Sequence, residues 1–160
     1  MRVDADEMDE SRIIQSTAWL EHIGGITMEL GRVDDTLEVI SRLAEPRGID
    51  YSRPVVAHSV VVDTIAETVA VMEELAVGWR DAKIRLAQEQ NEARRIILKL
   101  PNKAYASLLV CRYVDRMKWE DVGRAIGYDG NYACGYLDKP AKLMLYDYLP
   151  PEWKLPKAYK

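Results

Sequence analysis

Two heptad-spaced rows of mostly apolar residues restrict the fold of this chain more than any other sequence feature. Both rows advance by alternating steps of four and three residues, the spacing of a helix face that packs against another helix. The first row is Trp19, Ile23, Ile26, Leu30, Val33, Leu37, Ile40 and Ala44. The second row is His58, Val62, Ile65, Val69, Met72, Ala76, Trp79, Lys83, Leu86, Gln90, Ala93, Ile97 and Leu100. We therefore expect two long helices.

The segment between the rows, EPRGIDYSRP, contains two prolines and a glycine, so the first helix should end there and the chain should turn. A helix over residues 11–45 and a second helix from about residue 54 to residue 100 predict an antiparallel helical hairpin, a coiled coil. Gly24 and Gly25 mark either a bend or a close crossing with another helix. A break of the second helix near Gly78 is an open alternative.

We expect the polar residues of the second row, and both cysteines of the chain, to have structural and not binding roles. His58, Lys83 and Gln90 interrupt the second row, and single polar residues in such a row commonly fix register and partner choice. We favour that role over a binding site. Cys111 and Cys134 are expected to be reduced and buried, as small hydrophobic residues that form neither a disulfide nor a metal site.

Residues 101–149 are predicted to form three short helices. Pro101 ends the preceding helix, and Asn102 can cap the next one. A second helix of barely two turns should end at Gly127 in the left-handed conformation. Its expected buried stripe is Trp119, Val122, Ala125 and Ile126. Two short helices joined by a tight, glycine-containing turn, with a third behind them, are typical of a helix-turn-helix.

The run RYVDRMKWEDVGRAIGYDGNY, followed by Leu137 and Ala141, resembles region 4 of sigma-70-type factors. It resembles more closely the ArpU-like transcription regulators of bacteriophages and mobile elements. The matching pairs are Arg112 with Tyr113, Trp119 with Glu120, and Gly127 with Tyr128. The resemblance is strong over the C-terminal third of the chain and implies a sigma-region-4-like domain whose last helix lies in the major groove of duplex DNA.

The third helix, expected over residues 131–145, supplies the candidate DNA-binding residues. Ala133, Leu137, Ala141 and Met144 fall on one face, which would pack on Val110, Val122 and Ile126. Asn131, Tyr132, Tyr136, Lys139 and Lys142 would then point away from that core. Asn131 can read adenine through two hydrogen bonds, and the tyrosines can contact phosphate or a thymine methyl. Arg112, Lys118 and Arg124, on flanking helices, are the expected phosphate clamps.

Three residues depart from the family pattern on this helix. Gly135 stands where relatives place a basic residue, and Asp138 adds negative charge to the same region. Pro140 removes a backbone donor and should kink or shorten the helix, at a cost of about 3 kcal/mol. A packing role without DNA contact is therefore the competing interpretation.

The C-terminal part of the chain has a net positive charge, as binding to DNA requires. The chain carries a net charge of −4, but residues 1–100 hold 12 Lys and Arg against 19 Asp and Glu, and residues 101–160 hold 10 against 7. Phosphate contacts supply most nonspecific affinity for DNA, so the positive part is where they are needed. In the tail over residues 150–160, Trp153 and Leu155 should pack back on the domain, and Lys154, Lys157 and Lys160 make the end basic.

No catalytic or phosphate-binding motif is present in the sequence, so we expect neither an enzyme nor a cofactor. The acidic, polar start and the lack of a long apolar run predict a protein of the bacterial cytoplasm, without a membrane span.

The expected organisation is a hairpin over residues 1–100, a helix-turn-helix domain over 101–149 and a basic tail over 150–160. The function that the resemblance implies is transcription regulation in a phage or prophage, with duplex DNA and RNA polymerase as expected partners and with self-association of the chain. A protein-interaction factor acting through its coiled coil, and a DNA-packaging recognition subunit, are the alternatives.

Overall fold

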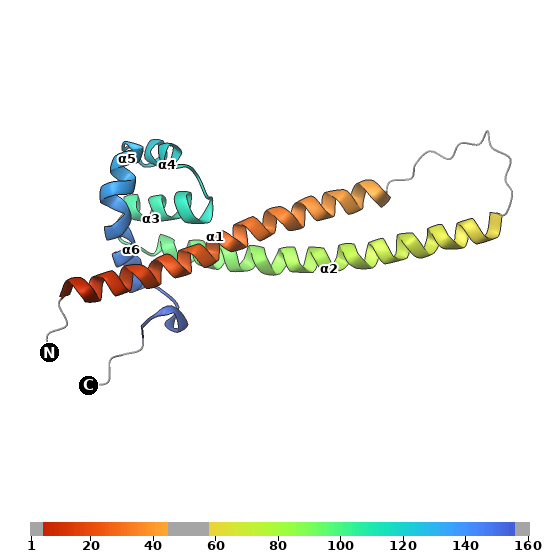
Figure 1. Cartoon of the computed structure of the whole chain (residues 1–160), viewed down its shortest axis with the longest axis horizontal. Helices are drawn as coiled ribbons and strands as arrows, with labels where there is room; N and C mark the ends of the chain where they lie inside the picture. The colour runs from red at the N-terminus through yellow and green to blue at the C-terminus, as the bar shows by residue number, and fades with distance from the viewer. Residues whose placement is uncertain (1–4, 45–57, 156–160) are drawn as a thin grey trace. The chain divides into compact units, whose positions relative to one another are not determined.

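The computed structural model describes residues 5–44 and 58–155 (Figure 1). Every regular element in these two ranges is helical, so the predicted all-α class is confirmed. α1 covers Ala5–Ala44 and α2 covers His58–Leu98, and α2 continues through Gly78 without a break. The predicted turn over residues 45–54 lies outside the described residues, as do the side chains of His58, Val62 and Ile65.

The C-terminal part of the chain is a series of short helical elements. These are α3 (Lys103–Leu109), the π-helical turn η1 (Val110–Val114), α4 (Trp119–Ile126), α5 (Gly130–Tyr132), the π-helical turn η2 (Ala133–Leu137), α6 (Asp138–Tyr146) and the 3-10 turn η3 (Pro151–Trp153). No described helix has a stretch long and apolar enough to cross a membrane.

The chain divides into two compact units, each containing parts of both long helices. Unit 1 consists of residues 1–28 and 88–160, and unit 2 of residues 29–87. This division differs from the predicted boundaries at residues 100 and 149. The beginning of α1 and the end of α2 belong to the same unit as the short C-terminal helices, because the apolar residues of all these elements form one core.

The core of unit 1 joins residues from the beginning of α1, the end of α2 and the short helices. Its fully buried side chains include Leu20, Ile97, Leu100, Leu108, Leu109, Val114, Val122 and Leu145. Trp19 and Ile23 of the first row and Ala93 of the second are also buried, as the heptad spacing predicts. Leu20, outside the first row, is also fully buried.

α1 meets the α3–η1 segment closely at Gly24. A Cβ atom at Gly24 would lie 3.3 Å from the carbonyl oxygen of Tyr113. The Thr27 hydroxyl donates to the carbonyl of Val114 at 2.6 Å and accepts from the Gln90 amide at 2.9 Å. The close-crossing interpretation is therefore confirmed at Gly24, and Gln90 has a packing role.

In unit 2, one ion pair joins α1 to α2, and one residue of each predicted row is fully or almost fully buried. Val33 and Ala76 are buried, and Lys83 forms an ion pair with Asp34 at 2.5 Å. Lys83 thus meets a carboxylate on the other helix, which fits the register role expected for it.

Two helix ends of the C-terminal part follow the predicted chemistry. Oδ1 of Asn102 accepts hydrogen bonds from the N–H groups of Ala104 and Tyr105, so Asn102 caps α3. Gly127 ends α4 with φ of 80°, a left-handed conformation that costs a glycine little.

The stripe predicted for α4 is wrong at one position. Ala125 is exposed, while Val122 is fully buried. Trp119 and Ile126 lie at the boundary of the core. The buried residues of α4 are Val122 and Gly123, so the inner face of the helix is turned toward Gly123 and away from Ala125.

The tail folds back on unit 1 through residue 155. The Trp153 ring lies 5.3 Å from the His22 ring, and the Leu155 N–H donates to the Tyr146 hydroxyl at 3.0 Å. The expected packing of Trp153 and Leu155 is confirmed. Lys157 and Lys160 lie outside the described residues.

Candidate nucleic-acid interface

Two glycines, Gly123 in α4 and Gly130 in α5, allow the backbones of the two helices and of the turn between them to approach closely. A Cβ atom at Gly123 would lie 2.6 Å from the carbonyl oxygen of Tyr128, and one at Gly130 would lie 2.8 Å from that of Trp119. Asp129 caps α5 by accepting from the Asn131 N–H at 2.9 Å. Sequence reasoning missed Gly123 and Gly130; a glycine inside a short helical pattern and another just after the turn were the available signal.

Arg112 holds the segment that leads into α4. Its guanidinium donates to the Met117 carbonyl at 2.8 Å and lies 4.9 Å from the centre of the Trp119 ring. Within the same segment Arg116 has a left-handed φ of 57°, and the Met117 N–H donates to the Cys111 carbonyl. Arg112, predicted as a phosphate clamp, therefore has an internal partner, and its side chain is half-buried.

The helical run from residue 130 to residue 146 continues through Pro140. In η2 the hydrogen bonds widen, and the Asp138 N–H bonds the Ala133 carbonyl five residues earlier. Pro140 is then the third residue of α6, directly after this π turn. The expectation that Pro140 would shorten the helix is wrong, because the helical run continues to Tyr146; the run does change from α-helix to a π turn directly before α6.

Three tyrosines form an exposed stack along the run, which we call the tyrosine ladder: Tyr128, Tyr132 and Tyr136. The Tyr128 and Tyr132 ring centres are 5.5 Å apart, and the Tyr132 and Tyr136 centres 5.1 Å apart, with rings inclined by 19° and 28°. The exposed fractions are 47%, 44% and 70%. The stack fixes the ring orientations while their outer surfaces face water.

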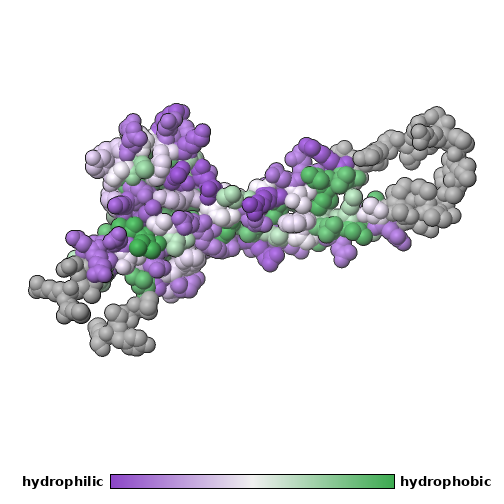
Figure 2. Space-filling view, viewed as in Figure 1, coloured by the Kyte–Doolittle hydropathy of each residue, from purple (hydrophilic) through white to green (hydrophobic). Residues whose placement is uncertain are grey.

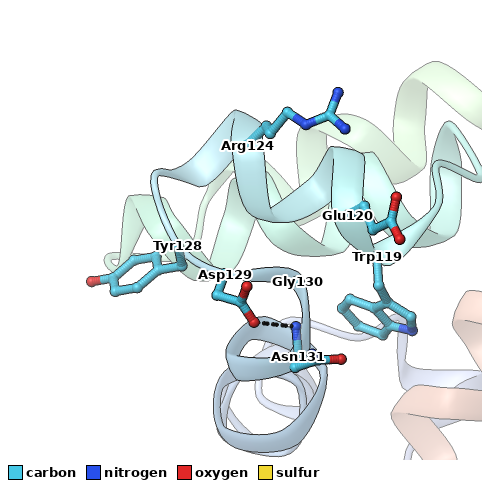
Figure 3. A pocket seen from close by; sticks show the side chains of 7 residues that line it. All are labelled: Trp119, Glu120, Arg124, Tyr128, Asp129, Gly130 and Asn131. Carbon is cyan, nitrogen blue, oxygen red and sulfur yellow. Dashed lines mark hydrogen bonds between the residues drawn. The ribbon is translucent and has the colours of Figure 1, made fainter.

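A polar hollow of about 400 Å³ lies beside the ladder, between α4 and α5. Its lining residues are Trp119, Glu120, Arg124, Tyr128, Asp129, Gly130 and Asn131. Figure 3 shows the Tyr128 ring pointing outward on one side of this hollow and the Trp119 side chain on the other. The hollow therefore combines a cationic, an amide and an aromatic side chain within one surface.

Lys142 does not point away from the core, and this prediction is wrong. Lys142 and Asp138 are each 9% exposed, and Nζ of Lys142 lies 2.9 Å from Oδ2 of Asp138. The Tyr113 hydroxyl donates to Oδ1 of Asp138 at 2.8 Å, and Lys142 lies 4.9 Å from the centre of the Tyr113 ring. The charge of Asp138, expected on the DNA-facing surface, is thus balanced inside the domain.

The pKa of Tyr113 is raised well above its usual value by burial and, secondly, by the hydrogen bond to Asp138. The neutral phenol is the form that can donate to the carboxylate. The cluster of Tyr113, Asp138 and Lys142 therefore joins η1 to α6 as a structural link.

The other predicted residues lie at the surface. Asn131, Tyr132, Tyr136, Lys139, Lys118 and Arg124 are all exposed. Arg124 also lies 3.4 Å from Asp121 in an exposed pair, which leaves its guanidinium accessible. The structure brings Asn131 and Arg124 to the same hollow.

Cysteine placement corrects one further expectation. Cys111 is half-buried and Cys134 is exposed, and both are free thiols. The pKa of Cys111 is raised by burial and by Asp115.

Among the residues that the structure describes, no group of three or more His, Cys, Asp or Glu side chains is arranged to hold a metal ion.

Comparison with known proteins gives no match to a family model, to a curated protein or to a solved structure.

Proposed function

We propose that the protein is a phage or prophage transcription regulator that binds duplex DNA through a sigma-region-4-like helix-turn-helix. In this proposal α4 and the helix beginning at α5 are the bihelical pair, and α1 and α2 form an antiparallel hairpin. The observation that carries the proposal is the exposed face of residues 130–139. On that face an amide, two stacked tyrosines and a lysine project from a helix held against α4 by a glycine turn.

The side chains on this face suit base-edge and phosphate contacts. A single asparagine can donate to and accept from adenine, and tyrosine hydroxyls bind phosphate oxygens. Asn131 and Tyr132 occupy the first turns after the cap, and a helix that enters the major groove contacts bases with its N-terminal residues. Lys118, Arg124 and Lys139 are the exposed cations that would contact phosphate, whereas Lys142 leaves the proposed set because Asp138 holds it.

The balance of charge on this face favours a specific mode of contact. Residues 118–139 hold three Lys and Arg against four Asp and Glu, and one of those four, Asp138, is neutralised by Lys142. Binding through few phosphates gives a shallow dependence on salt, since the slope follows the number of neutralised phosphates. We therefore propose that hydrogen bonds and aromatic contacts supply much of the affinity.

The same near-neutral aromatic surface supports a second candidate function. Tyrosine is enriched in the centres of protein interfaces, and charged residues are depleted there. The C-terminal part could accordingly bind a protein such as RNA polymerase, with α1 and α2 as the main interaction surface. A DNA-packaging recognition subunit would use the same two parts, and a large ring in solution would distinguish it.

Selection of bound duplexes from a random-sequence DNA pool by the full chain tests the leading proposal. Enrichment of one motif over successive rounds is the expected result. Retention of DNA without a motif, or no retention at low salt, would favour the protein-binding function. The proposal includes cytoplasmic action, no catalysis, and self-association, which would carry two DNA-binding domains to one duplex.

A further inference from the structure

Unit 2 exposes apolar side chains along a face of α2 that α1 does not cover. Val71 and Leu75 are 56% and 52% exposed, whereas Ala76, on the side of the predicted row, is 6% exposed. Gly78 and Ala82 continue the uncovered stripe at helical spacing. With Trp79 and Glu74 they line an open groove of about 610 Å³. Figure 2 shows hydrophobic residues gathered on the surface of the part of the molecule that unit 2 forms.

From this stripe we infer that α2 pairs with α2 of a second copy of the chain, antiparallel, about a two-fold axis between Ala76 and Val77. The inference concerns the self-association included in the proposed function and is independent of DNA binding. The stripe Val71, Leu75, Gly78 and Ala82 is self-complementary under that axis, because its steps of four, three and four residues read the same in both directions.

The sizes of the side chains match across this pairing. The axis places Val71 opposite Ala82 of the second copy and Leu75 opposite Gly78 of the second copy. Each large side chain thus meets a small residue, and each pair occurs twice, as an isologous interface requires. A parallel pairing in register would set Gly78 against Gly78 and leave a gap at the centre.

Gly78 gives a second, independent reason for a close neighbour. A glycine inside a helix destabilises the helix relative to alanine. A Cβ atom at Gly78 would have nothing within 4 Å, so no contact inside the chain requires a glycine there. The side chain of Leu75 from a second copy would occupy that open space.

Charge along α2 also selects the antiparallel direction. Residues 66–75 contain three glutamates and no Lys or Arg, while residues 78–87 contain three Lys and Arg and one Asp. Antiparallel pairing lays the acidic segment of each copy along the basic segment of the other, and brings Glu67 near Arg85 of the second copy. One pair of equivalent contacts is unfavourable, because Asp81 and Glu74 flank the stripe on the same side, and Asp81 of each copy would face Glu74 of the other.

Sedimentation equilibrium of the full chain over a range of concentrations tests the pairing. The wild-type chain should show the mass of two chains at micromolar concentration. Gly78→Gln should weaken self-association at least tenfold while it increases helix content by circular dichroism, since its side chain has room in the single chain. A Gly78→Gln chain that associates like the wild type, or a wild-type chain that is monomeric throughout, would overturn the inference.

The unfavourable contact supplies a matched pair of charge variants. Asp81→Arg would face Glu74 of the second copy with the opposite charge and should strengthen association several-fold. Glu73→Arg makes the same change in net charge on the other side of the helix and should leave association unchanged. Equal effects of the two variants would show that net charge, and not this interface, controls association.

Cross-linking reports the direction of the helices. With Cys111 and Cys134 replaced by alanine, a mixture of Val71→Cys and Ala82→Cys chains should form mixed disulfides. A Val71→Cys chain alone should form few, and efficient self-linkage there would contradict the antiparallel arrangement. None of these measurements depends on DNA, so loss of the DNA-binding proposal and loss of this interface are separate outcomes.

Discussion

The hydroxyl of Tyr113 donates a hydrogen bond of 2.8 Å to Asp138, whose other carboxylate oxygen lies 2.9 Å from the ammonium of Lys142. The two residues joined by the hydrogen bond are 25 positions apart in the chain. They link η1, before α4, to α6, after it.

Replacement of Lys142 should destabilise the fold strongly. Lys142→Met leaves the Asp138 carboxylate buried without its cation, and breaking a buried pair in this way costs about 3–5 kcal/mol. Lys139→Met, an exposed neighbour, should change the free energy of unfolding by no more than about 0.5 kcal/mol. Urea denaturation of both variants measures the difference, and similar midpoints would show that the pair contributes little.

Tyr113 should make stability depend on pH in the alkaline range. Because the folded-state pKa is raised above the unfolded value of about 10, the contribution is fully present below that pH and is lost as pH rises beyond it. Tyr113→Phe should cost about 2 kcal/mol near neutral pH, through loss of a hydrogen bond to a charged group.

The cost of Tyr113→Phe should therefore shrink above about pH 10, the unfolded-state value. Urea midpoints of the wild type and the variant, measured at neutral and at alkaline pH, test this. A difference that stays constant with pH would mean that Tyr113 ionises equally in the folded and unfolded states.

Two nearby glycines should respond in opposite ways to substitution by alanine, Gly130 at the glycine turn and Gly135 in η2. Gly130→Ala puts a Cβ atom 2.8 Å from the Trp119 carbonyl oxygen, so α4 and α5 must separate, with a loss of about 1–3 kcal/mol. Gly135→Ala has nothing within 4 Å and should stabilise the helix by up to about 1 kcal/mol. Thermal unfolding of the two alanine variants compares them, and equal shifts would contradict the close approach at Gly130.

Arg112 and Lys118, both predicted as phosphate contacts, should behave differently. Arg112→Ala removes the bond to the Met117 carbonyl and the contact with the Trp119 ring, and should lower the unfolding midpoint. Lys118→Ala should leave stability unchanged and, in the proposed function, weaken binding to all duplexes while lowering the salt slope by about one phosphate. If Arg112→Ala were as stable as the wild type and reduced the salt slope of DNA binding as Lys118→Ala does, Arg112 would instead be a phosphate contact.

Much of the fold follows from local rules in the sequence. The heptad rows predicted the two long helices. Asn102 was predicted to cap a helix and Gly127 to end one in the left-handed conformation, and the structure contains both. These features depend on spacing and on backbone chemistry within a few residues, so they can be read before any tertiary contact is known.

The errors arose where a distant contact decides the outcome. Lys142 looked exposed from its helical position, but Asp138 one turn earlier and Tyr113 from another helix make a buried site for its charge. Pro140 looked like a helix breaker, but a π turn before it shifts the hydrogen bonds. The stacking of the tyrosine ladder, including Tyr128, depends on rotamers that sequence spacing alone does not fix.

The most direct test of the central claim is the affinity of the full chain for a selected duplex and for an unrelated duplex at one salt concentration. Asn131→Ala should lose about 1–3 kcal/mol on the selected duplex and little on the unrelated one, because a bidentate base contact discriminates between bases. Arg124→Ala, as the phosphate control, should weaken both alike. Equal affinity of wild type and Asn131→Ala for the selected duplex would contradict base reading by the exposed face of this helix.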